Sequence, residues 1–407
     1  MGLGIERIET LLLIAAVVAM LARRLRLPYT VGLVLAGAVL ALFRVTSGTE
    51  LTKDLIFTSF LPPLVFEAAI SIPWRELRRD LPVVLTLATL GVLLSAGITA
   101  AGMRYTVGWQ WTSALLFGAL IAATDPVSVI ALFKELGVRG RLRLLVEAES
   151  LLNDGTAAVA FSIAMIAAAG GHVQGPGIAK EFVVMILGGM LCGGLVAGLL
   201  LLIAGRTEDH LLEITFTTVA AYGSFLVAEH VGVSGVLAVL TAGMLVGNVG
   251  SLGSISERGR EAVASFWEYV AFVANSLIFL LIGMREAQLH FTRVMIPAVA
   301  AILLIMFGRA LVVYLCCGLF RRSALRVPIN YQHVLFWGGL RGALALALAL
   351  GLPAGAPHRE EIVSVAFIVV AFSVIAQGLT MRPLLNKLRL EGSAPGNASQ
   401  SEETEAL

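Results

Sequence analysis

Long apolar stretches fill most of the chain, and polar residues collect in short segments between them. A transmembrane helix needs about 20 predominantly apolar residues to cross the hydrocarbon core of a bilayer. The pattern therefore predicts an all-α integral membrane protein. The thirteen expected spans are roughly residues 9–25, 28–43, 51–70, 81–105, 112–136, 142–170, 179–205, 211–231, 233–250, 262–285, 291–320, 332–352 and 359–388.

The Lys and Arg residues test this segmentation, because basic residues gather on the cytoplasmic side of a membrane. Most of the 29 basic residues fall at alternate ends of the spans, which predicts an outer N-terminus and a cytoplasmic C-terminus. The first apolar run precedes its basic cluster, so we expect a retained helix instead of a signal peptide. Residues 1–390 are expected to form a single transmembrane domain, and residues 391–407 a short disordered cytoplasmic tail.

The composition excludes several other classes of protein. Hydrophobic residues make up 58% of the chain and charged residues 14%, whereas a soluble domain carries about 25% charged residues. A soluble enzyme, a disordered chain and a disulfide scaffold are therefore excluded. The net charge is only +2, so no nucleic-acid partner is expected. Cys192, Cys316 and Cys317 lie in apolar runs and lack metal-ligand spacing, which disfavours disulfides and zinc.

A few charged residues lie deep inside the expected spans, where each costs at least about 2.5–3.5 kcal/mol. Such residues are functional candidates by default, and here they are Glu67, Asp125, Glu149, Asp154, Arg309 and Arg341. Other acids lie nearer to span ends, where a solvated or snorkelling end group is the favoured interpretation. These are Glu147, Glu213, Glu229 and Glu268.

The fifth span carries a predicted helix break. Pro126 lacks an amide proton and disfavours helix at Asp125, so we expect the helix to be interrupted there, beside Thr124. Interrupted backbone is tolerated within a membrane only where it lines a protein-enclosed or watery cavity. A plain proline kink is the weaker interpretation, because an acid lies next to the proline in mid-span.

The sixth span carries the densest group of oxygen donors. Glu149 and Asn153 are four residues apart, as are Ser150 and Asp154, so the two pairs occupy adjacent faces of one helix. Hard oxygen donors of this kind suit a hard cation. The alternative is a structural hydrogen-bond network between helices, which we consider less favoured in so apolar a span.

A second break is expected in the twelfth span, where glycines surround Arg341 in the stretch 338–342. The fifth and twelfth spans are seven apart, which fits two six-helix inverted repeats joined by a linking helix. Inverted repeats with paired broken helices indicate a secondary transporter with a site near the midplane. No residue-level repeat supports this, so the prediction depends on the topology and the breaks.

At this point the chain resembles a known family. The stretches ATDPVSVIALF (123–133), ESLLNDG (149–155) and GGLRGALALAL (338–348), together with Arg309, are similar to those of NhaP-type sodium/proton antiporters. These belong to the monovalent cation:proton antiporters, which include the animal sodium/proton exchangers. Pro62-Pro63 followed by Glu67 also resembles the third span of the family. The resemblance extends from Leu11 to about Leu388.

The resemblance implies a homodimer in the plasma membrane of a prokaryote that works as an elevator. The dimer-domain helices would lie within 9–70 and 179–285, and the core-domain helices within 81–170 and 291–388. It implies that Asp154 alternately takes a cation or protons, and that Asn153 marks electroneutral one-for-one exchange. The transported Na⁺ would be coordinated by Asp154, Glu149, Ser150 and Thr124. The supporting residues would be Asp125, Arg309 (paired with Glu149), Arg341 and Glu67.

Na⁺ and H⁺ are the expected partners besides the bilayer, and no cofactor is expected. The Walker motif GxxxxGK[ST] of ATP-driven pumps does not occur in the sequence. A K⁺/H⁺ antiporter of the same fold is the main alternative. A cation channel is less favoured, because the acids concentrate on a few spans of one chain. An intramembrane enzyme is also disfavoured, because the six histidines lie in loops or at span ends.

Overall fold

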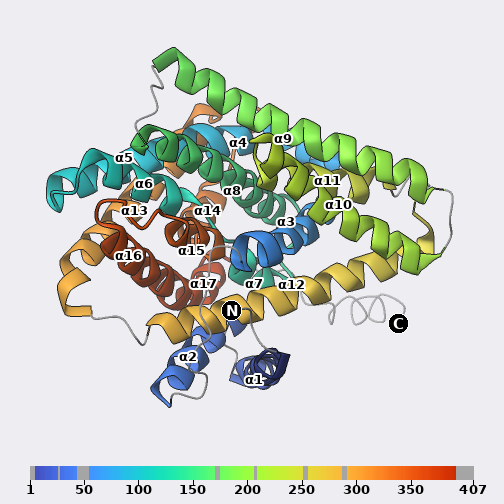
Figure 1. The fold of residues 1–407 in the computed structure, drawn as a ribbon, viewed down its shortest axis with the longest axis horizontal. Helices are drawn as coiled ribbons and strands as arrows, with labels where there is room; N and C mark the ends of the chain where they lie inside the picture. The colour runs from blue at the N-terminus through green and yellow to red at the C-terminus, as the bar shows by residue number, and fades with distance from the viewer. Residues whose placement is uncertain are drawn as a thin grey trace, which may run out of the picture.

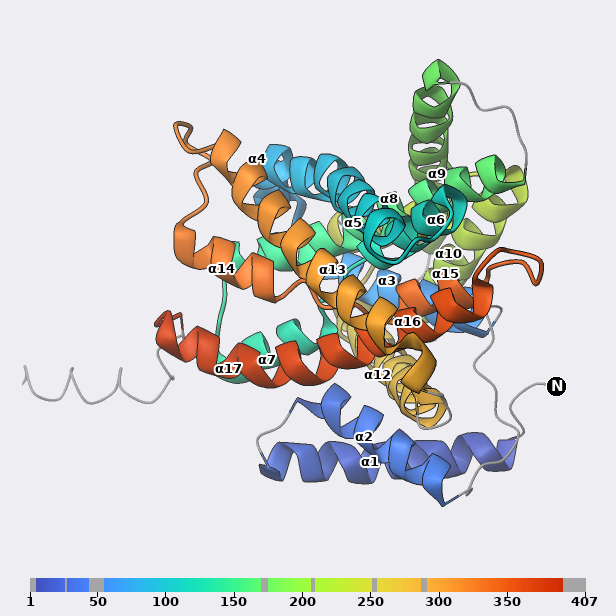
Figure 2. The ribbon, with the colours of Figure 1, turned by 90° about the vertical axis from the view of Figure 1, so that its left-hand side faces the viewer.

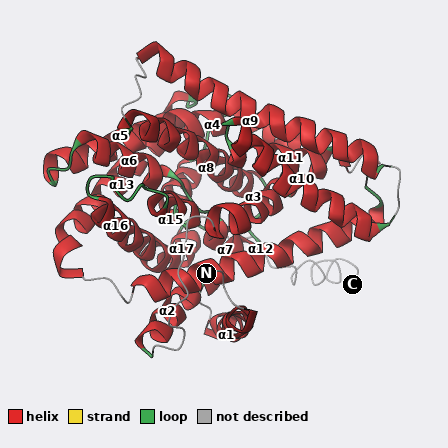
Figure 3. Cartoon of the chain, viewed as in Figure 1, coloured by secondary structure: helices red, strands yellow, loops and turns green. Residues whose placement is uncertain are grey.

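The computed structural model describes residues 5–25, 28–43, 55–169, 175–205, 209–250, 255–286 and 291–390. All regular secondary structure in these ranges is helical (Figure 3). Within them, 8 helices are long and apolar enough to cross a membrane, and shorter apolar helices occupy Glu9–Ala22, Tyr29–Leu42, Leu55–Ile70 and Gly235–Asn248. An all-helical membrane fold is thus confirmed. The thirteen crossings, the inverted repeats and the orientation stay predictions, and the predicted tail lies outside the described residues.

The helices pack as two groups. The first group comprises α1 (Ile5–Leu25), α2 (Tyr29–Leu42), the π-helical turn η1 (Leu55–Phe60), α3 (Leu61–Ile70), α9 (Gly175–Ala204), α10 (His210–Val231), α11 (Gly235–Asn248) and α12 (Glu257–Glu286). In Figures 1 and 2, α1 and α2 lie together at the lower edge, next to α12. Members of this group contact one another far more than they contact the rest of the protein.

The second group contains the remaining helices, which come from two separate stretches of the chain. The first stretch supplies α4 (Trp74–Leu85), η2 (Thr86–Gly91), α5 (Val92–Thr106), α6 (Trp111–Ala122), α7 (Val127–Leu136) and α8 (Arg141–Ala168). The second stretch supplies α13 (Phe291–Leu319), α14 (Ile329–Trp337), α15 (Ala343–Leu350), α16 (Arg359–Phe372), η4 (Ser373–Gln377) and α17 (Gly378–Lys387). The identity of the two groups as dimer and core domains stays a prediction.

Glycines bring α2 and α12 into direct main-chain contact within the first group. A Cβ atom on Gly37 of α2 would lie 2.1 Å from the carbonyl oxygen of Leu280, and one on Gly283 of α12 would lie 2.0 Å from that of Val34. No side chain fits at either position. Small residues at such crossings let membrane helices approach closely and gain van der Waals contact. The two helices are therefore fixed firmly to each other.

Glycine also brings two helices of the second group into main-chain contact. A glycine between the two groups faces a side chain instead. A Cβ atom on Gly118 of α6 would lie 2.3 Å from the main-chain oxygen of Ala96 in α5. Between the groups, Gly155 of α8 faces a side chain instead, with Cδ2 of Leu237 in α11 at 2.3 Å from its virtual Cβ atom. Side chains can change rotamer, so this contact between groups is easier to rearrange than a main-chain contact.

Two helices are broken at the places that the sequence predicts. Residues 123–126 separate α6 from α7, and residues 338–342 separate α14 from α15. The two breaks touch, because the amide of Asp125 donates a hydrogen bond of 2.7 Å to the carbonyl oxygen of Leu340. A Cβ atom on Gly342 would lie 2.0 Å from Oδ2 of Asp125, so only glycine permits this approach. The non-helical segments 123–126 and 338–342, which separate α6 from α7 and α14 from α15, therefore lie in direct contact.

Candidate functional site

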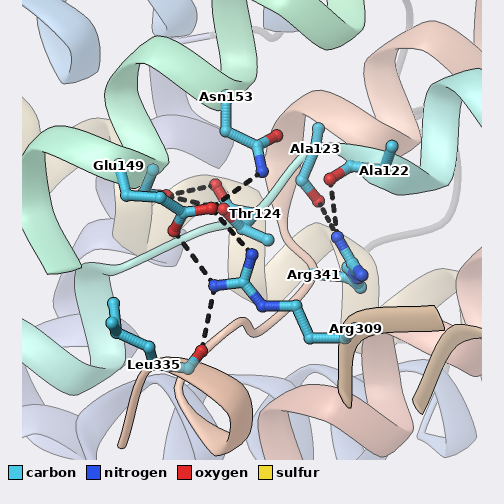
Figure 4. A network of polar contacts seen from close by, with 9 residues as sticks. Ala122, Ala123, Thr124, Glu149, Asn153, Arg309, Leu335 and Arg341 are labelled. Carbon is cyan, nitrogen blue, oxygen red and sulfur yellow. Dashed lines mark hydrogen bonds and ion pairs between the residues drawn. The ribbon is translucent and has the colours of Figure 1, made fainter. Parts of the chain in front are cut away.

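A buried ion pair lies beside the breaks. Nη1 of Arg309 in α13 is 2.7 Å from Oε1 of Glu149 in α8, and Nη2 is 3.0 Å from Oε2. Their side chains are only 6% and 3% exposed. Nη2 also donates to the carbonyl oxygen of Leu335, at the end of α14 (Figure 4). The pair implied by the family resemblance is therefore present, and it compensates the charge on Glu149.

Hydrogen bonds join α8 to the break between α6 and α7. The Ser150 hydroxyl donates to the main-chain oxygen of Thr124 at 2.6 Å, and the two hydroxyl oxygens are 3.1 Å apart. One turn along α8, Nδ2 of Asn153 donates to Oε1 of Glu149 at 3.3 Å (Figure 4). Oδ1 of Asn153 is buried without a partner among the described residues. The polar face predicted for the sixth span is thus turned toward the broken helix.

Asp154 differs from Glu149, because no ion pair with a basic residue in the described part of the chain compensates its charge. Its Oδ1 atom is buried and has no hydrogen-bond partner among the described residues. Asp154 lines a cavity of about 70 Å³. The other polar residues that line this cavity are Glu67, Thr124, Asp125 and Asn275. A cavity of this size holds a few water molecules or a partly hydrated cation.

Asp125 and Arg341 hold the ends of the broken helices. Oδ1 of Asp125 accepts the amide of Val127, the first residue of α7, at 2.9 Å. Nη1 of Arg341 donates to the carbonyl oxygens of Ala122 and Ala123 at 2.7 and 3.0 Å (Figure 4). The acid thus lies at a helix N-terminus and the base at a helix C-terminus, where each complements the helix dipole. Both residues stabilise main chain that a continuous helix would have satisfied.

The predicted site residues lie around these breaks and form two sets. Asp154, Thr124, Asp125 and Glu67 line the cavity. Glu149, Ser150, Asn153, Arg309 and Arg341 form the adjoining network, and none of these five lines the cavity. Coordination of a cation by any of them stays a prediction. In the described part of the chain, no group of three or more His, Cys, Asp or Glu residues could hold a resident metal.

One lining residue was missed by the sequence analysis. Asn275 of α12 is 5% exposed and lies in the run Val273–Leu277, which is otherwise apolar except for Ser276. The signal was available, because an amide in an apolar span also needs a reason. Asn153 and Thr124 each lie next to an Asp, whereas Asn275 has no charged neighbour in its run, so the pattern of charges does not single it out.

Two acids near span ends contradict the favoured interpretation of solvated end groups. Glu213 is 0% exposed, and its carboxylate accepts the amide and the hydroxyl of Ser256 at 2.9 and 3.1 Å. Glu147 is 8% exposed and lies 3.4 Å from Nε of Arg143. For both residues the interpretation is wrong, because partners on neighbouring turns or helices replace water. The side chain of Glu268 is 70% exposed, which agrees with the interpretation as a solvated end group.

An all-helical membrane protein in which two broken helices meet beside an uncompensated carboxylate belongs to the class of secondary ion transporters. Comparison with known proteins narrows this class. The family model "Sodium/hydrogen exchanger, transmembrane" matches residues 11–387. The chain belongs to this family, whose members are transporters and not enzymes.

Characterised relatives cover nearly the whole chain. It is 39% identical over 384 residues to the Na⁺/H⁺ antiporter ApNhaP of Aphanothece halophytica, spanning 93% of this chain and 73% of that one. It is 34% identical over 400 residues to the Na⁺/H⁺ antiporter NhaH of Halobacillus aidingensis, spanning 94% and 98%. The solved sodium/proton antiporter MjNhaP1 of Methanocaldococcus jannaschii has the same fold, with a TM-score of 0.76 at 21% identity over 95% and 99% of the two chains.

Proposed function

We propose that this protein exchanges Na⁺ for H⁺ across the plasma membrane of a prokaryote, one for one, with Asp154 as the shared carrier. The observation that carries the proposal is the unpaired, buried Oδ1 atom of Asp154 in a cavity beside the two helix breaks. The relatives named as Na⁺/H⁺ antiporters support the choice of ions.

Competition for Asp154 couples the two fluxes. A carboxylate that holds a proton is neutral and no longer attracts a cation, so the site carries one or the other. Glu149 is compensated by Arg309, and Asn153 carries no charge. One carboxylate that alternates between Na⁺ and H⁺ keeps the same charge in both loaded forms. Exchange by this route is therefore electroneutral.

The packing of the two helix groups supports an elevator. We propose that helices within 81–170 and 291–388 move as a core domain against helices within 9–70 and 179–285, which form the dimer domain. Among the described residues, polar contacts between the groups are of a kind that can exchange partners. They include the Thr30–Ser128 hydroxyl pair at 2.6 Å and the exposed Lys134–Glu268 pair at 3.5 Å. Such a movement would expose Asp154 to each side in turn.

The central experiment measures proton flux driven by a Na⁺ gradient in proteoliposomes. Asp154→Asn should abolish exchange, because an amide cannot bind a proton or attract a cation as a carboxylate does. Glu257→Gln is the matched control, because it neutralises an acid of the other helix group whose side chain is 95% exposed and should leave exchange intact. Exchange that persists in Asp154→Asn would refute the carrier assignment. Exchange driven by K⁺ in place of Na⁺ would favour the alternative K⁺/H⁺ antiporter, and a flux that does not saturate would favour a channel.

A second experiment tests electroneutrality. An imposed membrane voltage should not change the rate of exchange by the unmodified protein. Asn153→Asp adds an acidic group one residue before the carrier, and any exchange it retains should respond to voltage. A voltage-dependent rate in the unmodified protein would refute the one-for-one stoichiometry.

A further inference from the structure

Asn275 lines the Asp154 cavity and carries an unsatisfied oxygen. The residue is 5% exposed, and its Oδ1 atom is buried without a partner among the described residues. Leaving a buried carbonyl oxygen unpaired is costly, so such an atom usually has a ligand, a water molecule or a function. Asn275 and Asp154 both line this cavity, and each carries one buried oxygen without a partner among the described residues.

The two residues belong to different helix groups. Asp154, Thr124 and Asp125 are contributed by α6–α8 of the second group, whereas Asn275 is contributed by α12 of the first group. The glycine contacts at Gly37 and Gly283 fix α12 to α2, so Asn275 is held by the first group. A displacement of one group against the other therefore changes the separation of Asn275 and Asp154.

We propose that Asn275 is a cation ligand that acts in only one of the two states of the transport cycle. Its Oδ1 atom coordinates the ion at Asp154, directly or through one water molecule, in the state described here. When the second helix group moves, Asn275 stays behind with α12 and the ion loses this ligand. The affinity for Na⁺ is then higher on one side of the membrane than on the other. This inference rests on the proposed function.

The chemistry of an amide suits this task. A side-chain carbonyl oxygen is a hard donor of the kind that alkali cations accept. The amide does not titrate, so it contributes to cation binding without taking a proton and leaves the one-for-one coupling unchanged. Its loss should weaken the binding of Na⁺ while the binding of H⁺ is preserved.

The chain offers a close control one residue away. Ser276 is 0% exposed, and its Oγ atom is also buried without a partner among the described residues, yet it does not line the cavity. Asn275→Ala and Ser276→Ala each remove one buried polar group from α12. Asn275→Asp keeps an oxygen at the same position and serves as the conservative variant.

The experiment measures KM for Na⁺ from each face of proteoliposomes in which the protein has a known orientation. Asn275→Ala should raise KM about tenfold from one face and less than about twofold from the other, with the maximal rate nearly unchanged, as expected for one lost contact to a charge. The pH that gives half-maximal exchange, extrapolated to zero Na⁺, should be the same in Asn275→Ala as in the unmodified protein. Ser276→Ala should match the unmodified protein, and Asn275→Asp should retain a KM close to it at alkaline pH.

A second readout does not depend on transport. Na⁺ that binds the folded protein raises its Tm, and the concentration for half of this rise should increase about tenfold in purified Asn275→Ala. An unchanged KM, an equal rise from both faces, or the same rise in Ser276→Ala would overturn the inference while leaving the proposed function intact. Failure of the unmodified protein to exchange ions would instead refute the proposed function.

Discussion

Replacing Arg309 with Ala would leave the Glu149 carboxylate buried with no cation beside it. The guanidinium makes two hydrogen bonds to this carboxylate, of 2.7 and 3.0 Å, and one of 2.9 Å to the oxygen of Leu335. Neither partner is more than 6% exposed, so water cannot replace the lost contacts. Removing one member of a buried ion pair costs about 3–5 kcal/mol, mostly through the charge that is left behind.

An exposed ion pair provides the comparison. Nη2 of Arg382 is 2.6 Å from Oε1 of Glu135, a distance close to that in the buried pair, but these side chains are 27% and 52% exposed. Exposed pairs of this kind contribute about 0–1 kcal/mol. Arg382→Ala should therefore destabilise the protein much less than Arg309→Ala, although the shortest contact between arginine and carboxylate is of similar length in the two pairs.

The assay is thermal or denaturant unfolding of purified protein in detergent at two pH values. An uncompensated buried carboxylate can take up a proton and so lose its charge. The deficit of Arg309→Ala should consequently be larger at pH 8 than at pH 5. Arg309→Met combined with Glu149→Gln removes both charges and should recover most of the loss. Equal stability of Arg309→Ala and Arg382→Ala would refute the view that burial determines the strength of this pair.

Other predictions follow from the helix contacts and the breaks. Gly283→Leu should destabilise the fold by at least about 1–3 kcal/mol in the same unfolding assay, whereas Gly318→Leu should be tolerated, because no atom lies within 4 Å of a Cβ there. Arg341→Ala should lower both exchange activity and stability, by about 1.5–3 kcal/mol, since two helix-end carbonyls lose a charged donor; an unaltered Tm would contradict this. KM for Na⁺ should rise as pH falls, by up to about tenfold per pH unit with an unchanged maximal rate; a steeper rise would contradict competition by one proton.

Much of the fold was predictable because membrane helices must satisfy their own backbone and present apolar side chains to lipid. Exposed leucines at helical spacing on α9, such as Leu187, Leu191 and Leu195, illustrate this rule. Both helix breaks were predictable from Pro126 and the glycines of 338–342, because these residues weaken a helix wherever they occur. The exposure of acids near span ends was less predictable. Glu213 is fully buried, and its carboxylate accepts hydrogen bonds from Ser256, which is distant in sequence.

The sequence predicted most of the residues that form the candidate site, but not how these residues are arranged. Charged residues inside apolar spans stand out in the sequence because the bilayer penalises each of them. Which acid is compensated depends on contacts between helices: Arg309 lies 160 positions from Glu149 and pairs with it, while Oδ1 of Asp154, a residue that lines the cavity, has no partner among the described residues. Asn275 carries no charge and has no charged neighbour, so the penalty that marks the acids and arginines does not single it out, although an amide in an apolar span is itself a signal.

The sequence by itself therefore determined the membrane location, the apolar spans, the two breaks and the small set of residues that could bind an ion. Each of these follows from a local property: apolar length, a missing amide proton, or a charge in hydrocarbon. Only the tertiary structure decided that the breaks meet at Asp125 and Leu340, that the Arg309–Glu149 pair is almost fully buried, and that two separate helix groups enclose Asp154. These outcomes depend on close approach between segments far apart in the chain, which no local pattern of residues specifies.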